Sequence, residues 1–268
     1  MAQSDPTILI FDSGLGGLTV HREVAAARPD VRLIYAADDA AFPYGPMQES
    51  KLVPRVCAVI GALIESHKPD LIVIACNTAS TIALPELRTR FTLPFVGTVP
   101  AVKPACAASA SKRVSVLGTE ATVRREYTRD LIRQFSNGVE VTLVGSPRLA
   151  GYAEAELRGK PVEDAAIAEE IAGCFIDSAG RRTDTVVLAC THYPLLQHRF
   201  RQTQPWPVTY LDPAPAIARR VNQLLGPAGA REPAQSARMV TTLGQAPSPE
   251  LQKALFSFGI KEFGGISV

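Results

Sequence analysis

Short runs of apolar, mostly β-branched residues recur along this chain and alternate with longer segments of helical periodicity. Four such runs lie in the first hundred residues, at Thr7–Phe11, Val31–Ala36, Leu71–Ala75 and Phe95–Gly97. Continuous apolar runs of this length are typical of strands that are buried on both faces of a parallel sheet, and helices are the usual connections between parallel strands. The pattern therefore predicts an α/β fold.

The same series of elements is repeated in the second part of the chain. Runs at Val114–Leu117, Val139–Val144, Thr185–Ala189 and Val208–Tyr210 follow the first four after 107, 108, 114 and 113 residues. Helical patterns at Arg124–Phe135 and Asp164–Ala179 lie between them. A nearly constant offset indicates a duplicated unit. We therefore predict two pseudo-symmetric flavodoxin-like lobes, with mostly parallel sheets, helices on both faces and a site between the lobes.

The segment after residue 210 has no counterpart at the end of the first repeat. It contains a helical pattern at Ala214–Leu225, a loop rich in Pro, Gly and Ala, a strand-like run at Met239–Leu243 and a helical pattern at Pro249–Phe256. We expect this segment to return to the first lobe and complete it. The expected lobes are thus residues 1–98 with 210–268, and residues 99–209.

One phrase of the sequence occurs in both halves and ends on a cysteine each time. It reads Asp-Leu-Ile-Val-Ile-Ala-Cys76-Asn77-Thr78 in the first half and Asp-Thr-Val-Val-Leu-Ala-Cys190-Thr191-His192 in the second. Ligands of open α/β sheets bind at the carboxyl ends of the strands, so two facing repeats bring two thiols to one cleft. A free cysteine is more commonly a small core residue. The polar residues that follow both cysteines favour the functional interpretation.

A glycine-rich turn follows the first strand-like run and reads Asp12-Ser13-Gly-Leu-Gly-Gly-Leu-Thr19. It lacks the last glycine of a dinucleotide-binding loop and the GK[ST] ending of a Walker A loop. Such a turn can still bind one carboxylate or phosphate, and Asp12 is either a helix cap or a functional group. The second repeat has hydroxyls at this place, from Thr119 and Thr122.

The turn at Pro43-Tyr44-Gly45 follows the second strand-like run. It can offer a hydroxyl and a closely approaching backbone to a ligand, or be an ordinary surface turn. The five cysteines show no CxxC spacing, so neither a zinc ribbon nor a disulfide framework is indicated. Cys57, Cys106 and Cys174 lack polar neighbours of the kind that follow the other two cysteines and are interpreted as core or surface residues.

Composition excludes several classes of function. The formal net charge is +2 with no basic run, so neither nucleic acid nor an anionic membrane is an expected partner. No stretch reaches the roughly 18 apolar residues of a membrane-spanning helix, and the first residues lack the pattern of a signal peptide. We expect a cytoplasmic protein. None of the seven lysines lies in a motif that suggests a pyridoxal-phosphate site.

Four motifs taken together closely resemble the cofactor-independent glutamate racemases of bacteria. They are Asp12-Ser13-Gly14-x-Gly16-Gly17, Pro43-Tyr44-Gly45, Ala75-Cys76-Asn77-Thr78-Ala79 and Ala189-Cys190-Thr191-His192-Tyr193-Pro194. The resemblance implies interconversion of L- and D-glutamate, a role in supplying D-glutamate for peptidoglycan synthesis, no cofactor, no metal and often a homodimer. Asp39 and the residues Ala40-Ala41-Phe42 depart from the usual pattern.

The resemblance also implies roles for individual residues. Cys76 and Cys190 would be the two acid/base groups, acting on D- and L-glutamate respectively, with Asp12 and His192 assisting them. Glu154 stands where members of the family carry an acidic residue, in a segment that matches only loosely. The substrate would be held by Asp12, Ser13, Pro43, Tyr44, Gly45, Asn77, Thr78, Thr191 and His192, and we add Thr119 and Thr122 for their hydroxyls.

Physical chemistry gives the same interpretation without the family. Inversion at Cα requires removal of a proton from one face and delivery of a proton to the other, and two thiols with pKa values near about 8.5 can supply the two groups. Three alternatives stay open. An aspartate or hydantoin racemase shares the thiols, a metal protein could use Cys76, Cys190, Asp12 and His192 as ligands, and a two-lobed binding protein needs no chemistry.

Overall fold

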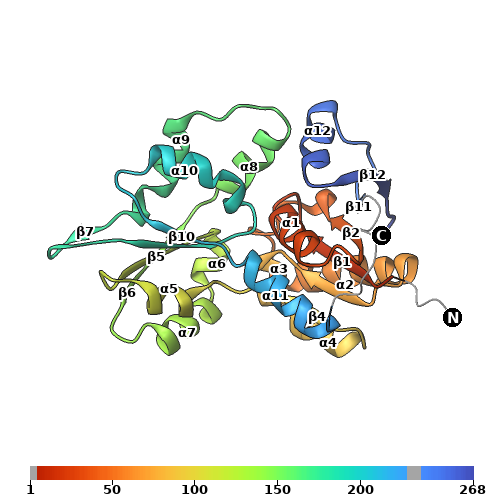
Figure 1. Ribbon diagram of the computed structural model, residues 1–268, viewed down its shortest axis with the longest axis horizontal. Helices are drawn as coiled ribbons and strands as arrows, with labels where there is room; N and C mark the ends of the chain where they lie inside the picture. The colour runs from red at the N-terminus through yellow and green to blue at the C-terminus, as the bar shows by residue number, and fades with distance from the viewer. Residues whose placement is uncertain (1–4, 228–236) are drawn as a thin grey trace.

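Two parallel sheets form the centre of the molecule (Figure 1). The computed structural model describes residues 5–227 and 237–268. The larger sheet has the strand order β12-β11-β2-β1-β3-β4 and the smaller one β10-β9-β5-β6. The strands of the larger sheet are β1 (Thr7–Asp12), β2 (Arg32–Ala37), β3 (Leu71–Ile74), β4 (Phe95–Gly97), β11 (Ala237–Thr241) and β12 (Ile260–Gly265). Those of the smaller sheet are β5 (Arg113–Gly118), β6 (Glu140–Gly145), β9 (Thr185–Ala189) and β10 (Thr209–Leu211).

The two sheets repeat one arrangement. The order β2-β1-β3-β4 in the larger sheet matches β6-β5-β9-β10 in the smaller one, and every pairing in both sheets is parallel. This is the flavodoxin-like order, in which the chain reverses its direction of winding beside the first strand. The predicted fold class is therefore confirmed. The strands β11 and β12 extend the larger sheet at the β2 edge.

Helices cover both faces of the sheets. They are α1 (Leu18–Ala27), α2 (Glu49–His67), α3 (Asn77–Ile82), α4 (Leu84–Arg90), α5 (Val102–Ala108), α6 (Glu120–Arg124), α7 (Glu126–Phe135), α8 (Leu149–Leu157), α9 (Asp164–Ile171), α10 (Gln197–Thr203), α11 (Ala214–Leu225) and α12 (Pro249–Ser257). Three 3₁₀ turns accompany them: η1 (Asp39–Ala41), η2 (Ala172–Cys174) and η3 (Tyr193–Leu196).

The apolar runs of the sequence are strands with a hydrophobic core on each face. Along β1, Ile8 and Ile10 pack into one core while Leu9 and Phe11 pack into the other, and all four side chains are fully buried. Burial of each such side chain contributes about 1.5–3 kcal/mol. The polar side chains Asp12, Asn77, Thr191 and His192 instead end or follow the strands at the carboxyl edges of the sheets, which makes these edges the place for chemistry.

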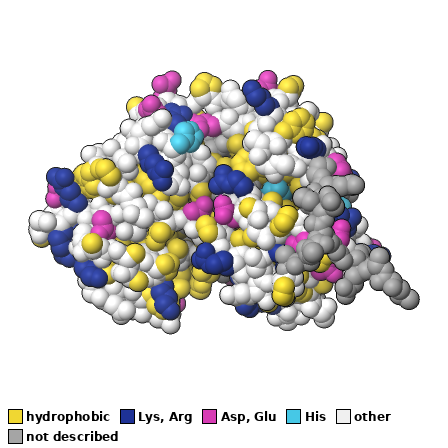
Figure 2. Space-filling model, in the orientation of Figure 1, with side chains coloured by type: hydrophobic (Ala, Val, Ile, Leu, Met, Phe, Trp, Pro, Cys, Tyr) yellow, Lys and Arg dark blue, Asp and Glu magenta, His cyan; other side chains and the backbone are white. Residues whose placement is uncertain are grey.

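The end of the chain packs beside its beginning. In Figure 1 the blue elements α11, α12, β11 and β12 lie against the red and orange elements of the larger sheet, and α11 shares a hydrophobic core with α1. Basic and acidic side chains are interspersed on the face shown in Figure 2, in agreement with the small net charge.

Two predicted helices need correction, and one strand was missed. The predicted helix Asp164–Ala179 ends at Ile171, and η2 and a hairpin of β7 (Asp177–Ser178) and β8 (Arg181–Arg182) follow, because Ala179 and Gly180 adopt the positive φ values of a tight turn. The predicted helix Arg124–Phe135 is two helices, α6 and α7. Strand β12 was not predicted. Residues 228–236 of the predicted Pro/Gly/Ala-rich loop, and residues 1–4, lie outside the described residues.

Candidate functional site

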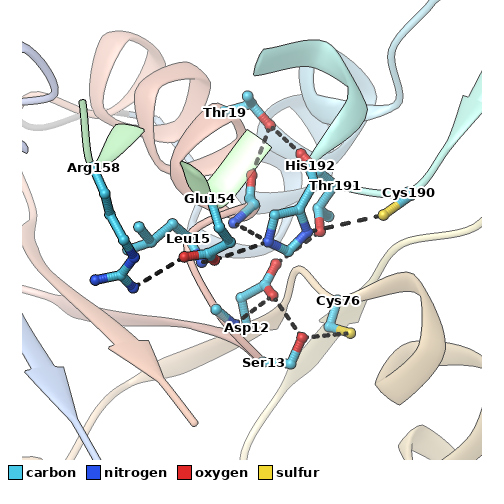
Figure 3. Close-up of polar contacts among 12 residues, drawn as sticks. Asp12, Ser13, Leu15, Thr19, Cys76, Glu154, Arg158, Cys190, Thr191 and His192 are labelled. Carbon is cyan, nitrogen blue, oxygen red and sulfur yellow. Dashed lines mark hydrogen bonds and ion pairs between the residues drawn. The ribbon is translucent and has the colours of Figure 1, made fainter. Parts of the chain in front are cut away.

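The strands that end at the site are the same in both repeats. Strand β1 ends at Asp12 and β3 leads into Cys76, while β5 leads into Thr119 and β9 into Cys190. β1 neighbours β3, and β5 neighbours β9, so each repeat brings two adjacent strand ends together. Figure 3 shows the two thiols approaching from different lobes, each with polar side chains beside it.

A small internal cavity separates the two thiols. Most of the predicted site residues line it: Ser13, Pro43, Tyr44, Gly45, Cys76, Asn77, Thr78, Thr119, Cys190, Thr191 and His192. Its volume is about 20 Å³, which is room for a single water molecule.

Cys76 is linked to a carboxylate through a hydroxyl. Its Sγ donates to Ser13 Oγ at 3.7 Å, and that hydroxyl donates to Asp12 Oδ1 at 3.2 Å. Burial, followed by the charge of Asp12, raises the pKa of the Cys76 thiol to about 12, although the contacts with the Ala79 amide and with Ser13 act to lower it. Cys76 is therefore a thiol at neutral pH unless another group takes its proton.

Cys190 is linked directly to an imidazole. Its Sγ lies 3.9 Å from His192 Nδ1, and His192 Nε2 lies 3.1 Å from Glu154 Oε1. Burial lowers the pKa of His192, but the hydrogen bonds and charges of Cys190 and Glu154, together with the charge of Asp12, raise it well above its usual value. Thiol, imidazole and carboxylate thus form a row in which the imidazole can exchange a proton with the thiol.

The protonation state of His192 determines which hydrogen bond its Nε2 atom forms. The amide of Gly16 also points at Nε2, at 3.1 Å, yet this nitrogen either donates to Glu154 or accepts from Gly16. A raised pKa favours the imidazolium, which donates from Nε2 to Glu154 and from Nδ1 to Cys190. Burial raises the pKa of Glu154, but the hydrogen bond and charge of His192, the Leu15 amide and the charge of Arg158 lower it below the usual value.

The glycine turn touches the second lobe so closely that side chains are excluded. A Cβ on Gly16 would collide with the His192 ring, and a Cβ on Gly14 would collide with Glu154 and Phe42. The Leu15 amide donates to Glu154 Oε1 at 2.6 Å. These glycines are thus needed for the approach of the two lobes, in addition to any role in the turn itself.

Asp12 also joins the two lobes. Its Oδ2 accepts from Thr191 Oγ1 at 2.8 Å, and its Oδ1 accepts from the Gly14 amide at 3.0 Å. Glu49 of α2 and Arg125 at the start of α7 form a further contact across the cleft, at 3.5 Å. The Asp12–Thr191 hydrogen bond and the Glu49–Arg125 ion pair therefore both connect the two lobes.

The loop at Pro43–Gly45 presents its backbone to the cavity. The Tyr44 hydroxyl points the other way and donates to Asp38 Oδ2 at 2.6 Å, so it is not offered to a ligand. Asp38 is fully buried and also accepts from Arg55 and from Thr242 Oγ1, at 2.6 Å and 2.7 Å. This carboxylate anchors the loop to α2 and to the end of β11.

Asn77 is the side chain of the site with free hydrogen-bonding capacity. It is 3% exposed, and neither its Nδ2 nor its Oδ1 has a hydrogen-bond partner in the described part of the chain. A buried amide without partners costs free energy unless a ligand satisfies it. The neighbouring Thr78 is equally buried and lines the same cavity.

Three predicted site residues do not line the cavity. Asp12 lies behind Ser13 and Thr191, and Glu154 lies behind His192. Thr122 lies behind Thr119, with the two hydroxyl oxygens 2.9 Å apart.

Several groups of the site were missed by the sequence analysis. Phe42 and Ala150 line the cavity, Asp38 holds Tyr44, and the Leu15 and Gly16 amides contact the second lobe. The ion pair between Glu154 and Arg158 was also missed. The spacing of four residues, which places two side chains on the same side of a helix, was the one feature of the sequence that could have indicated it. The remaining cysteines, Cys57, Cys106 and Cys174, are buried in the hydrophobic cores as interpreted.

Two kinds of feature are absent from the described ranges, 5–227 and 237–268. No group of three or more His, Cys, Asp or Glu side chains there is placed to hold a metal ion. Likewise, no helix within those ranges has the length and apolar character needed to cross a membrane.

Known proteins are similar to this chain in sequence and in fold. The family model for Asp/Glu/hydantoin racemases matches residues 19–221. The glutamate racemase of Brucella anthropi is 54% identical over 232 residues, which cover 86% of this chain and 84% of that protein. The crystal structure of Escherichia coli glutamate racemase, in complex with L-glutamate and the activator UDP-MurNAc-Ala, is 39% identical with a TM-score of 0.89, covering 98% of each chain.

A more distant structure agrees. Glutamate racemase from Thermus thermophilus, in complex with β-chloro-D-alanine, is 26% identical with a TM-score of 0.74, over 98% of each chain. The family model spans most of this chain, and the Brucella relative shares more than half of the aligned residues. The chain therefore belongs to the Asp/Glu/hydantoin racemase family and is an isomerase of the racemase class.

Proposed function

We propose that this protein interconverts L-glutamate and D-glutamate by two-base proton transfer at Cα, and that it supplies D-glutamate for peptidoglycan synthesis. The observation that carries the proposal is that Cys76 and Cys190 line one cavity from two different sheets, each in contact with its own polar side chain. The similarity to relatives named glutamate racemase supports the choice of substrate.

In the proposed reaction the two thiols act on opposite faces of one carbon. The thiolate of Cys76 removes the Cα proton of D-glutamate while the thiol of Cys190 delivers a proton to the other face, and the roles are exchanged for L-glutamate. A cationic substrate ammonium group beside the buried thiolate stabilises it, because an opposite charge favours the ionised form. His192, as an imidazolium, then returns a proton to Cys190.

The intermediate carries negative charge on the substrate carboxylate. The free amide of Asn77 and the hydroxyls of Ser13, Thr78 and Thr191 surround the cavity in which this charge develops. Hydrogen-bond donors fixed in a water-poor site stabilise such a charge more than they do in water. Thr119, with Thr122 behind it, would hold the side-chain carboxylate from the second lobe.

We further propose the lobe boundaries 1–98 with 210–268, and 99–209, and a cytoplasmic homodimer. The pairing of β11 with β2 supports the return of the chain to the first lobe. The family resemblance supports the dimer, which light scattering coupled to size-exclusion chromatography tests directly.

The decisive experiment is incubation with L-glutamate in D₂O. Loss of optical rotation and uptake of deuterium at Cα are followed for the parent, Cys76→Ala, Cys190→Ala and, as a matched control, Cys57→Ala. Cys57 is buried in α2 and outside the cavity. We expect racemisation by the parent and the control only. Racemisation by either site variant at the parent rate would refute the two-thiol mechanism, and faster turnover of aspartate would refute the substrate.

A further inference from the structure

The two thiols reach their partners by different routes. Cys190 contacts His192 directly, whereas the hydrogen bonds from Cys76 run to Ser13 and from Ser13 to Asp12, as the row of dashed lines in Figure 3 shows. Among the described residues, no hydrogen bond joins the Cys76 sulfur to an Asp12 oxygen. Ser13 therefore stands between an acid/base group and the only carboxylate in its row.

We propose that Ser13 carries the proton of Cys76 to Asp12, and that it is a catalytic residue rather than a substrate ligand alone. This inference rests on the proposed two-thiol reaction. In the step, the S–H bond of Cys76 breaks as an O–H bond forms on Ser13, while the original hydroxyl proton of Ser13 passes to Asp12 Oδ1. The products are the Cys76 thiolate and the Asp12 carboxylic acid, and Ser13 is unchanged. The reverse transfer restores the thiol.

The charges around Cys76 explain why such a transfer is needed. The titratable groups that act on this thiol are Asp12, Cys190, Tyr35 and Tyr44, and His192 lines the same cavity beside Cys190. Loss of the thiol proton to water would place a second negative charge beside Asp12 in a buried site. Transfer of the proton to Asp12 instead moves the existing negative charge from Asp12 to Cys76, so the net charge of the site does not change.

Asp12 is shielded from solvent and is hydrogen-bonded through both carboxylate oxygens. The side chain is fully buried. The Gly14 amide and the Thr191 hydroxyl donate to the carboxylate. A hydroxyl both donates and accepts, so Thr191 can turn to accept a hydrogen bond when Asp12 is protonated. Ser13 has the same freedom, which is the property that a proton relay requires.

The test compares Ser13→Ala, which removes the relay, with Ser13→Thr, which keeps a hydroxyl. Ser115→Ala is the matched control, because it removes another fully buried serine hydroxyl from the second lobe. The measurement is kcat/KM for glutamate racemisation from pH 6 to 10. We expect Ser13→Ala to lose about 10²- to 10⁴-fold at neutral pH, the usual contribution of a positioned proton-transfer group. Ser13→Thr should recover part of this loss, and the control should match the parent.

The pH dependence separates a relay from a binding role. Hydroxide can take the thiol proton without Ser13, so the ratio of parent to Ser13→Ala activity should fall as the pH rises towards the pKa of Cys76, about 12. A ratio that is constant with pH, with a raised KM and an unchanged kcat, would show that Ser13 only binds substrate.

A relay role and a pure binding role for Ser13 both leave the proposed function standing. That function fails if the parent does not racemise glutamate, or if Cys76→Ala or Cys190→Ala racemises it at the parent rate.

Discussion

The charge of Glu154 is expected to control the proton on His192, and Glu154→Gln tests this. The substitution preserves the shape of the side chain and an oxygen that can still accept from the Leu15 amide. It removes the negative charge 3.1 Å from His192 Nε2. Burial lowers the pKa of His192, and without the charge of Glu154 this lowering is less strongly opposed, so the neutral imidazole becomes more favourable. A neutral His192 cannot return a proton to Cys190.

The size of the effect follows from the burial of the pair. The side chains of His192 and Glu154 are 3% and 10% exposed, so solvent screens their interaction poorly. Hydrogen bonds to charged groups contribute about 1.5–3 kcal/mol. Since about 1.4 kcal/mol corresponds to a factor of ten in rate, we expect kcat/KM of Glu154→Gln to fall about 10- to 150-fold at neutral pH.

The Glu154–His192 pair should also contribute to the stability of the fold, and most strongly within a defined pH range. The lowered pKa of Glu154 stabilises the fold above its ordinary value of 4.5, and this contribution is lost as the pH falls through the lowered pKa. The raised pKa of His192 stabilises the fold below its ordinary value of 6.5, and this contribution is lost as the pH rises through the raised pKa. The difference in melting temperature between parent and variant should therefore be greatest between pH 4.5 and 6.5.

Glu156→Gln is the matched control for these measurements. Glu156 lies on the same helix, α8, but pairs with Arg199 away from the cavity. We expect this variant to keep the parent activity. The reasoning is refuted if Glu154→Gln racemises glutamate within twofold of the parent from pH 6 to 9, or if its loss of melting temperature is independent of pH.

Three further substitutions follow from contacts of the site. Asn77→Ala should lower kcat/KM about tenfold or more and leave the melting temperature unchanged or higher, because it deletes two unpaired buried polar atoms; a matching loss of stability would contradict this. Asp38→Asn should raise KM by loosening Tyr44. It should lower the melting temperature at neutral pH, and this loss should shrink as the pH falls through the lowered pKa of Asp38, because burial raises that pKa but Arg55, Tyr44 and Thr242 together lower it more. Arg125→Ala breaks the ion pair with the exposed Glu49, so KM should change no more than about fivefold and the change should vanish at high salt.

The fold was predictable because most of its central strands, such as β1, β3, β5 and β9, are buried along their whole length. Continuous apolar runs marked the ten-strand framework except β12, and the offset between repeats gave the matching strand orders. Strand β12 was missed because its sequence, Ile260–Gly265, is charged and glycine-rich and five of its six residues are at least partly exposed at the sheet edge. The β7–β8 hairpin was missed because a turn at Ala179 and Gly180 interrupts a composition that otherwise favours a helix.

The candidate site was predictable only where its residues follow strand ends. Cys76, Cys190 and their neighbours share a sequence position in the repeat, so their convergence followed from topology. Contacts that depend on how the lobes meet have no such signal. The Leu15 and Gly16 amides contact Glu154 and His192, which lie 139 and 176 residues later in the chain. Because nearly all residues have a backbone amide, the sequence does not indicate which amides make such contacts. The pairing of Asp38 with Thr242 depends likewise on the return of the chain to the first lobe.

The differences between the two halves are constrained by the symmetry of the proposed reaction. L- and D-glutamate are mirror images with equal free energy, so their equilibrium constant is one and every variant must have the same kcat/KM in both directions. The imidazole beside Cys190 and the hydroxyl–carboxylate row beside Cys76 therefore cannot favour one direction of net conversion. Their inequality can appear only in kcat and KM taken separately. A change at Ser13 or at His192 must accordingly lower kcat/KM equally for both enantiomers, and any difference between the enantiomers must appear as compensating changes in kcat and KM.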